Sequence, residues 1–197
     1  MSTDRQPDGR AVRYQHRRPE LLGGVTEFVL EHGIANLALR AVAEGVGVSH
    51  ATLLRHFASK EELLAAVLVH IRTDLAARMS NDPELASAES TAELVARLWE
   101  LLCEPKEQRQ FLLLFELLGR HPARGQGDPD LSESLVLDWI ELLVGRLVED
   151  GWTRQAAEPV ATLVLAQIRG LQLDLLVTGD RERVDRAMQS SYRLLSR

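Results

Sequence analysis

Hydrophobic residues recur at intervals of three and four along nearly the whole chain, and this periodicity constrains the fold more than any other feature. An α-helix brings residues at such spacings onto one face, whereas a half-buried β-strand needs strict alternation. The sequence contains no sustained alternation among β-branched residues. The pattern therefore predicts an all-α protein.

The N-terminal part of the chain is predicted to contain four helices. The first is expected to begin near Pro19, a favoured first-turn residue, and to end at Gly33. Two short helices follow over about 39–44 and 50–56. The sequence SKEE at residues 59–62 is a capping box, which predicts the start of a long fourth helix.

The first predicted helix contains two adjacent glycines. Its inward face consists of Leu21, Leu22, Val25, Phe28 and Val29. Gly23 and Gly24 lie inside this helix and each costs roughly 1 kcal/mol relative to alanine. We therefore expect close packing against another helix at one of them or both.

Polar segments divide the rest of the chain. SNDPELASAES at residues 80–90 and HPARGQGDPD at residues 121–130 interrupt the apolar periodicity. Five further helices are predicted, which brings the total to about nine: 91–103, 105–120, 131–150, 155–178 and 181–196.

Composition sets the broad class of the protein. Of the 197 residues, 45% are hydrophobic and 26% are charged, which is typical of a soluble globular chain. No uninterrupted apolar run approaches the length of about 18 residues that a membrane span needs, and the first residues carry no apolar signal-peptide core. We expect a cytoplasmic protein without a membrane partner.

The single cysteine, Cys103, excludes an internal disulfide and a cysteine-based metal cluster. His70 and Asp74 are one helical turn apart, but no further metal ligands accompany them. The sequence therefore predicts neither a metal site nor a cofactor.

The charge is distributed unevenly along the chain. The net charge is -6, yet residues 1–60 carry 8 basic against 6 acidic side chains. Four arginines, Arg10, Arg13, Arg17 and Arg18, account for much of the N-terminal excess. They could meet DNA phosphates or form a solvated tail without a partner.

The segment GVGVSHATLLRHF, residues 45–57, allows three interpretations. A phosphate-binding GxGxxG loop would need a third glycine and a preceding strand, and both are missing here. A Ser-His nucleophile pair would need converging side chains, but adjacent residues on a helix point about 100 degrees apart.

A helix-turn-helix accounts for the whole of this segment. Val42 faces inward on the first helix, Gly47 permits the turn, and Ser49 caps the second helix. Leu53 and Phe57 then complete the small core. The second helix leaves its N-terminal residues outside the core, as an α-helix that enters the DNA major groove requires.

With these motifs, residues 18–71 resemble the TetR family of transcriptional regulators. ELLGGVTEFVLEHG corresponds to the first helix, and LRAVAEGVGVSHATLLRHFASKEELL to the helix-turn-helix and the start of the fourth helix. From residue 72 onward the likeness is one of architecture only. The resemblance implies an N-terminal helix-turn-helix DNA-binding domain followed by a larger helical ligand-binding and dimerisation domain.

The resemblance also implies which residues contact DNA. Arg40 would contact DNA from the start of the second helix. Base edges would be contacted by His50, Ala51 and Thr52, and phosphates by Ser49, His56 and Lys60.

The chain departs from the family pattern at two positions. Leu54 stands where the family usually has a phosphate-binding tyrosine, and Arg55 is the candidate to compensate. Ala38 stands where threonine or serine usually caps the second helix, a difference worth about 1 kcal/mol.

Residues 61–197, the larger and acidic part of the chain, carry a stripe of large apolar residues at helical spacing. Such a stripe can be ordinary core, but the resemblance implies an effector cavity, and some of these residues would then line it. The stripe consists of Trp99, Leu102, Cys103, Phe111, Phe115, Leu118, Trp139, Leu142 and Leu143. Polar groups that could orient a ligand are His70, Glu116, His121, Gln167 and Arg169.

The last two predicted helices are apolar on more than one face, which indicates a partner. The resemblance implies a four-helix bundle with a second copy of the chain. The candidate interface residues are Leu163, Gly170, Leu171, Leu175, Met188 and Tyr192.

Together these features predict a ligand-responsive, non-enzymatic transcriptional regulator, most simply a repressor. It would bind a palindromic double-stranded DNA operator as a homodimer and be released by a small apolar or aromatic effector. The expected organisation is a flexible basic arm over 1–17, the DNA-binding domain over 18–62, and the effector-binding and dimerisation domain over 63–197. The alternatives are a helical interaction adaptor that has lost DNA binding and a carrier of hydrophobic ligands.

Overall fold

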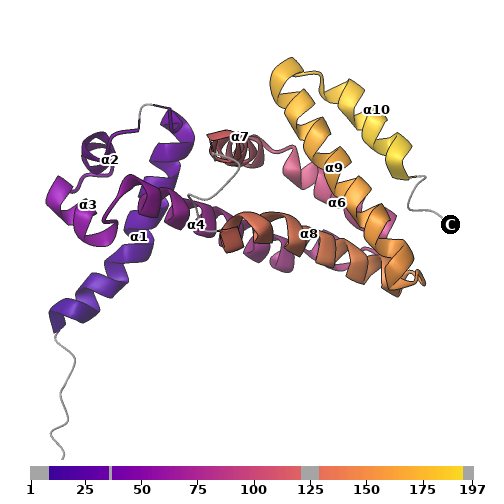
Figure 1. The fold of residues 1–197 in the computed structure, drawn as a ribbon, viewed down its shortest axis with the longest axis horizontal. Coiled ribbons are helices and arrows are strands. Elements are labelled where there is room, and N and C mark those ends of the chain that lie inside the picture. The colour runs from indigo at the N-terminus through magenta and orange to yellow at the C-terminus, as the bar shows by residue number, and fades with distance from the viewer. Residues whose placement is uncertain (1–8, 36, 121–128, 193–197) are drawn as a thin grey trace, which may run out of the picture. The chain divides into compact units, whose positions relative to one another are not determined.

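The computed structural model describes the backbone of residues 9–35, 37–120 and 129–192. The side chains of residues 9–17, 118, 120 and 129–135 lie outside this description. Over the described ranges the chain forms ten α-helices and no β-strand (Figure 1), which confirms the all-α prediction. The chain divides into two compact units, residues 1–77 and 78–197.

Unit 1 contains α1 (Gly9–His32), α2 (Leu39–Gly45), α3 (His50–His56) and most of α4 (Lys60–Asn81). Its core is formed by apolar side chains from all four helices, and along α1, α3 and α4 they recur at the predicted helical spacing. The fully shielded residues are Val25, Val29, Val42, Leu53, Phe57, Leu63 and Val67. The predicted inward positions of the helix-turn-helix are thus confirmed.

The first helix begins at Gly9 and not near Pro19. Arginine, alanine and glutamine predominate between residues 10 and 18, and all three favour helix. Pro19 lacks one backbone N–H but does not end the helix. Residues 9–17, expected to form part of a flexible arm, are therefore helical, whereas the predicted end is confirmed at Gly33, which has a φ of 69°.

The close approach between α1 and α2 requires a glycine on α2 and not on α1. A Cβ added at Gly23 would meet nothing within 4 Å, and one at Gly24 would make an ordinary contact with Val46. A Cβ at Gly45, by contrast, would overlap the ring of Phe28. The expectation for the α1 glycines is therefore wrong, because the position that must be glycine is Gly45 on α2.

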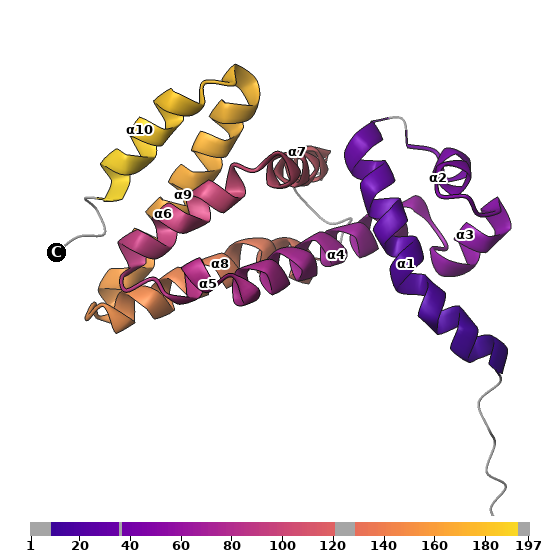
Figure 2. The same cartoon turned by 180° about the vertical axis from the view of Figure 1, so that it is seen from behind.

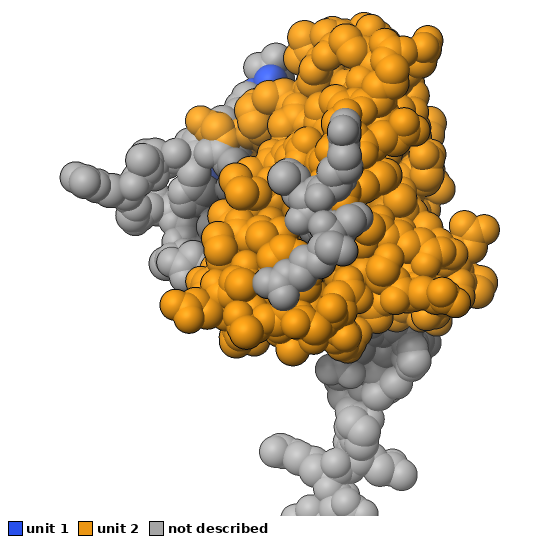
Figure 3. Space-filling view, turned by 90° about the vertical axis from the view of Figure 1, so that its right-hand side faces the viewer, with its two compact units in different colours: residues 1–77 blue, residues 78–197 orange. Residues whose placement is uncertain are grey.

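Unit 2 contains α5 (Pro83–Ala86), α6 (Thr91–Leu102), α7 (Pro105–Arg120), α8 (Pro129–Glu149), α9 (Arg154–Thr178) and α10 (Arg181–Ser191). Helix α9 packs against α8 and α7, and α10 folds back along α9 (Figure 2). The unit forms one continuous body (Figure 3). Its most deeply buried apolar side chains are Val95, Leu98, Trp99, Leu143, Val144, Leu147, Ala157, Ala161, Val184 and Met188.

Helix α5 lies in a segment that the sequence pattern predicts as a polar break. The Asp82 carboxylate accepts the backbone N–H of Glu84 at 2.8 Å and that of Leu85 at 3.2 Å. Pro83 follows at the first helical position, where its missing N–H has no cost. These two local signals form a single turn of helix without any apolar periodicity.

Polar contacts attach α10 to α6 within the same chain. The indole Nε1 of Trp99 donates to Asp185 at 2.6 Å, and Arg181 donates to Asp185 at 2.7 Å. Arg181 also donates to Glu100 at 2.6 Å. The Trp99–Asp185 and Arg181–Glu100 bonds join α6 to α10, whereas the Arg181–Asp185 bond lies within α10. The bond of the buried Trp99 indole adds most to the apolar contacts that hold α10 in place, because the Glu100 carboxylate is exposed.

By length and composition α9 is apolar enough to cross a membrane, and it alone passes this test among the described helices. The expectation drawn from apolar run length did not identify it. However, one face of α9, which includes Ala157, Ala161, Val164 and Ile168, is buried inside unit 2. Composition alone is therefore weak support for a membrane span.

Candidate functional site

The helix-turn-helix presents the first turn of α3 to solvent. The turn between α2 and α3 contains Gly47, which has a φ of 73°. Ser49 caps α3 by accepting the backbone N–H of Thr52 at 3.1 Å. Ser49 and Ala51 are exposed, and His50 and Thr52 are half-buried. A short helix anchored on its inner face and open at its N-terminal turn is suited to the DNA major groove.

Three side chains on the outer face of α3 are joined by hydrogen bonds. The hydroxyl oxygens of Ser49 and Thr52 are 2.8 Å apart, and an Arg55 guanidinium nitrogen donates to the Thr52 hydroxyl at 3.3 Å. These bonds fix the Thr52 rotamer and hold the Arg55 charge on this face. The Thr52 methyl group and further Arg55 donors can therefore reach DNA together.

Leu54 and Arg55 occupy the place at which the resemblance implies a missing phosphate contact. Leu54 is exposed and has no hydrogen-bonding group, so it cannot replace a tyrosine hydroxyl. Arg55 is exposed beside it and carries a permanent charge. The local geometry therefore favours Arg55 as the compensating contact.

His56 lies at the C-terminal end of α3 and is 8% exposed. Burial lowers the pKa of His56, and the charges of Arg18 and Arg55 lower it further. The ring is therefore mainly neutral at neutral pH and offers a phosphate at most one N–H. The role of His56 as a phosphate contact stays a prediction, limited by this burial to one N–H donor.

Lys60 and Arg40 flank α3. Lys60 is the first residue of α4, where its ammonium group donates to the carbonyl of Ile34 at 3.4 Å. The ammonium has three N–H donors, so two stay available for a phosphate near this helix N-terminus. Arg40 is exposed in the first turn of α2. The side chains of Arg10, Arg13 and Arg17 lie outside the described residues.

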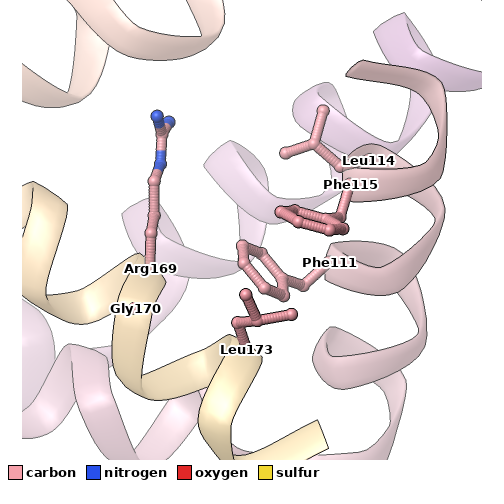
Figure 4. A pocket seen from close by; sticks show the side chains of 6 residues that line it. All are labelled: Phe111, Leu114, Phe115, Arg169, Gly170 and Leu173. Carbon is pink, nitrogen blue, oxygen red and sulfur yellow. The ribbon is translucent and has the colours of Figure 1, made fainter. Parts of the chain in front are cut away.

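A cavity of about 290 Å³ lies between α7 and α9 in unit 2. Figure 4 shows the rings of Phe111 and Phe115 with Leu173 on one side and Arg169 extending along the other. Its complete lining is Phe111, Leu114, Phe115, Arg169, Gly170 and Leu173. The cavity is suited to an apolar or aromatic molecule, because one charged group is its only polar feature.

The structure assigns the predicted pocket residues to different places. Phe111 and Phe115 line the cavity, whereas Trp99, Cys103 and Leu143 are buried in the core of unit 2 and do not line it. The remaining predicted lining residues behave as follows: Leu102 is also core, Leu142 is exposed on α8, Trp139 and Gln167 are half-buried outside the cavity, and His70 belongs to unit 1.

The sequence prediction could not separate core residues from cavity residues, because both are apolar and recur with the same helical period. Burial raises the pKa of the Cys103 thiol to about 12, so this group is an inert core thiol at neutral pH. The side chain of Leu118 and all of His121 lie outside the described residues. Leu114 and Leu173 were missed, although each is one helical turn from a lining residue that sequence analysis had singled out.

No group of three or more histidine, cysteine, aspartate or glutamate side chains could hold a metal ion within the described ranges.

Helices α8 and α9 expose apolar side chains that no other described part of the chain covers. Leu163 is 62% exposed and Val177 is 77% exposed on α9. On α8 the exposed apolar side chains are Leu137, Leu142 and Val148. Gly145 and Gly170 are also exposed on these two helices, which keeps parts of this surface low enough for a close helix approach.

The predicted interface residue on α10, Met188, is instead packed against its own chain, and Tyr192 directly follows this helix. Met188 is buried beside Val184, and Tyr192 is half-buried. Burial raises the pKa of Tyr192 to about 12, with further contributions from Glu100 and Asp185. The prediction for Met188 is corrected accordingly, whereas that for Tyr192 stays a prediction because its side chain is only half-buried. Leu171 and Leu175 on α9 are half-buried.

The sequence is similar to those of known transcriptional regulators. Residues 26–67 match the family model of the bacterial regulatory proteins of the tetR family. The HTH-type transcriptional regulator CymR of Pseudomonas putida is 24% identical over 188 residues. That alignment spans 94% of this chain and 92% of CymR.

Solved structures show the same fold. A transcriptional regulator from Rhodococcus sp. Rha1 superposes with a TM-score of 0.75 at 22% identity, covering 90% of this chain and 95% of that protein. The multidrug binding protein EbrR, complexed with malachite green, superposes with a TM-score of 0.62 at 22% identity, covering 89% of this chain and 97% of EbrR.

Proposed function

The chain belongs to the TetR family of DNA-binding transcriptional regulators, and from this premise we propose that it is a homodimeric repressor released by a small apolar or aromatic effector. The observation that carries the proposal is the helix-turn-helix itself, whose α3 presents a capped, exposed first turn. In the proposed organisation residues 18–62 bind DNA, and residues 63–197 bind the effector and the second copy.

Contacts to DNA are proposed for both bases and phosphates. His50, Ala51 and Thr52 would face base edges, because they lie in the open first turn of α3. Arg55 and Lys60 would bind phosphates, and the exposed hydroxyl of Ser49 and the guanidinium of Arg40 would add to these contacts.

The second copy is proposed to pack on the exposed apolar face of α8 and α9. Leu137, Leu142 and Leu163 are large apolar side chains that water would otherwise surround. A twofold-symmetric pair of chains carries two α3 helices and matches the symmetry of a palindromic operator, whose half-sites lie about one helical turn of DNA, roughly 34 Å, apart.

The effector is proposed to bind in the cavity between α7 and α9. The apolar and aromatic lining supports a small hydrophobic molecule over a sugar, a nucleotide or a metal ion. The likeness to EbrR, a multidrug binding protein complexed with malachite green, is in keeping with a small organic ligand. The effector must bind the DNA-free conformation better, because equal affinity for both conformations shifts nothing.

Helix α4 is the proposed route by which effector binding in the cavity affects the DNA-binding helices. This continuous helix begins at Lys60, beside the proposed DNA contacts, and ends at Asn81. Near its end Arg78 donates to the buried carboxylate of Glu107 and to Glu104 at 2.7 Å. Glu107 lies on α7, the helix that carries three of the cavity-lining residues, so a shift of α7 would act on the end of α4.

Two substitutions separate base reading from phosphate binding. Lys60→Ala should weaken binding to all DNA sequences and reduce the slope of log K against log salt by about 1.8 for the proposed dimer, because one phosphate contact is lost in each copy. Thr52→Val should change the preference at particular base pairs and keep the salt slope. DNA affinity at the parent level in both variants would contradict these assignments.

A further inference from the structure

Leu54 exposes an apolar side chain on α3, the helix that is proposed to enter the DNA major groove. It is 38% exposed, whereas Leu53 and Phe57 are buried on the inner side of the helix-turn-helix. Among the large hydrophobic side chains that the structure describes in unit 1, only Leu54 and Val69 are exposed, and Val69 lies on α4. Leu54 therefore adds nothing to the core, and it gains free energy if DNA covers it.

Helical geometry places Leu54 beside Ala51. The two residues are three positions apart, so they share one face of α3, and both are exposed. The Cα–Cβ bonds of a helix lean toward its N-terminus, which directs the Leu54 side chain over the turn that contains His50 and Ala51. Leu54 and Ala51 thus form an α3 apolar patch next to the residues proposed to contact base edges.

The α3 apolar patch is continuous with the proposed DNA contacts. Arg55 directly follows Leu54, is exposed, and donates to the Thr52 hydroxyl at 3.3 Å. The Ser49 hydroxyl lies 2.8 Å from the same Thr52 oxygen. Polar and cationic groups that suit DNA therefore border the patch, and DNA bound by them would also cover Leu54.

The major groove offers the patch one apolar partner. Hydrogen-bond donors and acceptors make up most of the base edges there, and the 5-methyl group of thymine is the apolar exception. A leucine side chain forms no hydrogen bond, so against a donor or an acceptor it would displace water and leave that group without a partner. The patch therefore favours thymine over the other bases.

We infer that Leu54, supported by Ala51, selects operator half-sites by contacting the 5-methyl group of thymine. The inference rests on the proposed function, because it names a feature of the DNA that α3 would bind. It also gives the departure from the family pattern at this position a role of its own. Leu54 exchanges the phosphate contact of a tyrosine for a base contact, while Arg55 supplies the phosphate contact.

Replacing thymine by uracil tests this contact, because uracil lacks the methyl group and keeps the base pairing. The intergenic DNA upstream of the chain's own gene would be prepared once with thymidine and once with deoxyuridine. Fluorescence anisotropy at one salt concentration would give the affinity of the full-length protein for each fragment. Burial of one methyl group corresponds to roughly fourfold in affinity, or roughly 15-fold over two half-sites. We expect the parent to prefer the thymidine fragment by this factor or more.

Substitutions on α3 assign the preference to Leu54. Leu54→Ala should lose most of it, whereas Leu54→Met, which keeps an apolar side chain of similar volume, should retain it. The ratio of the parent and variant preferences cancels every effect of uracil that does not involve Leu54, as in a double-mutant cycle. Arg55→Gln is the matched control, because loss of a phosphate contact should weaken binding to both fragments equally. Circular dichroism checks that each variant keeps its helical content.

The outcomes separate this inference from the proposed function. Equal affinity of the parent for both fragments, or an unchanged preference in Leu54→Ala, would overturn the inference. Weaker binding of Leu54→Ala to both fragments by the same factor would place Leu54 against the sugar–phosphate backbone, which also overturns it. In these cases tighter binding of the parent to the upstream fragment than to a scrambled fragment would still support the proposed function. Undetectable binding of the parent at low salt would contradict both.

Discussion

Leu163→Glu should dissociate the proposed homodimer, because this substitution places a charge on the exposed apolar face of α9. Leu163 is 62% exposed in the single chain, so most of its side chain is available for burial by a second copy. Full burial of a leucine contributes about 1.5–3 kcal/mol. About 60% of this value is available here, or about 1–2 kcal/mol per side chain.

The twofold axis doubles the effect, since each substitution occurs once in each copy. The loss is then about 2–4 kcal/mol per dimer, which corresponds to roughly 30-fold to 1,000-fold in the dissociation constant. Burial of two glutamate charges would increase the loss further. The variant should therefore be largely monomeric at concentrations at which the parent is a dimer.

Sedimentation equilibrium over a concentration series measures this dissociation constant directly. Gln189→Glu on α10 is the matched control, because it introduces the same charge at an exposed position on the helix that is packed against its own chain. Parent-like association of Leu163→Glu would refute the assignment of the interface to α8 and α9. A monomeric parent at micromolar concentration would refute the dimer itself.

Two further predictions concern stability. Gly23→Ala should raise the free energy of unfolding by about 0.5–1 kcal/mol, because alanine favours helix and its Cβ meets nothing; Gly45→Ala should lower it by about 1–3 kcal/mol, because the Phe28 ring must move. Urea unfolding followed by circular dichroism distinguishes the two, and equal effects would contradict the assigned α1–α2 contact. The lowered pKa of His56 means that the unfolded chain binds the proton more readily, so the His56 contribution to stability is full above pH 6.5 and is lost as the pH falls from there towards the folded-state pKa. His56→Gln should flatten this part of the stability profile, and an unchanged profile would show that another group is responsible.

The helix-turn-helix could be predicted in detail because its signals are local. Ser49 as a cap, Gly47 in the turn, and Leu53 and Phe57 as core all follow from residues within one or two helical turns. The same is true of the end of α1 at Gly33. The start of α1 could not be predicted, because helix-favouring residues on both sides of Pro19 outweigh the cost of one missing backbone donor.

The cavity and the interface depend on packing between distant segments, which periodicity does not encode. Trp99 and Phe111 belong to the same apolar pattern, but only Phe111 lines the cavity, because α10 covers Trp99 through Asp185. Likewise Met188 and Leu163 are both apolar and lie on neighbouring helices. The contact between α10 and the rest of unit 2 buries Met188 and leaves Leu163 exposed. The sequence indicated an unpartnered apolar surface but could not assign it to α8 and α9.

Binding of the full-length chain to the intergenic DNA upstream of its own gene tests the central claim most directly. Fluorescence anisotropy would compare this fragment with a scrambled fragment of equal length over a series of salt concentrations. We predict tighter binding to the upstream fragment, with an affinity that falls linearly in log K against log salt as phosphate contacts are screened. Undetectable binding at low salt, or equal affinity for both fragments, would contradict a sequence-specific regulator and favour the interaction adaptor.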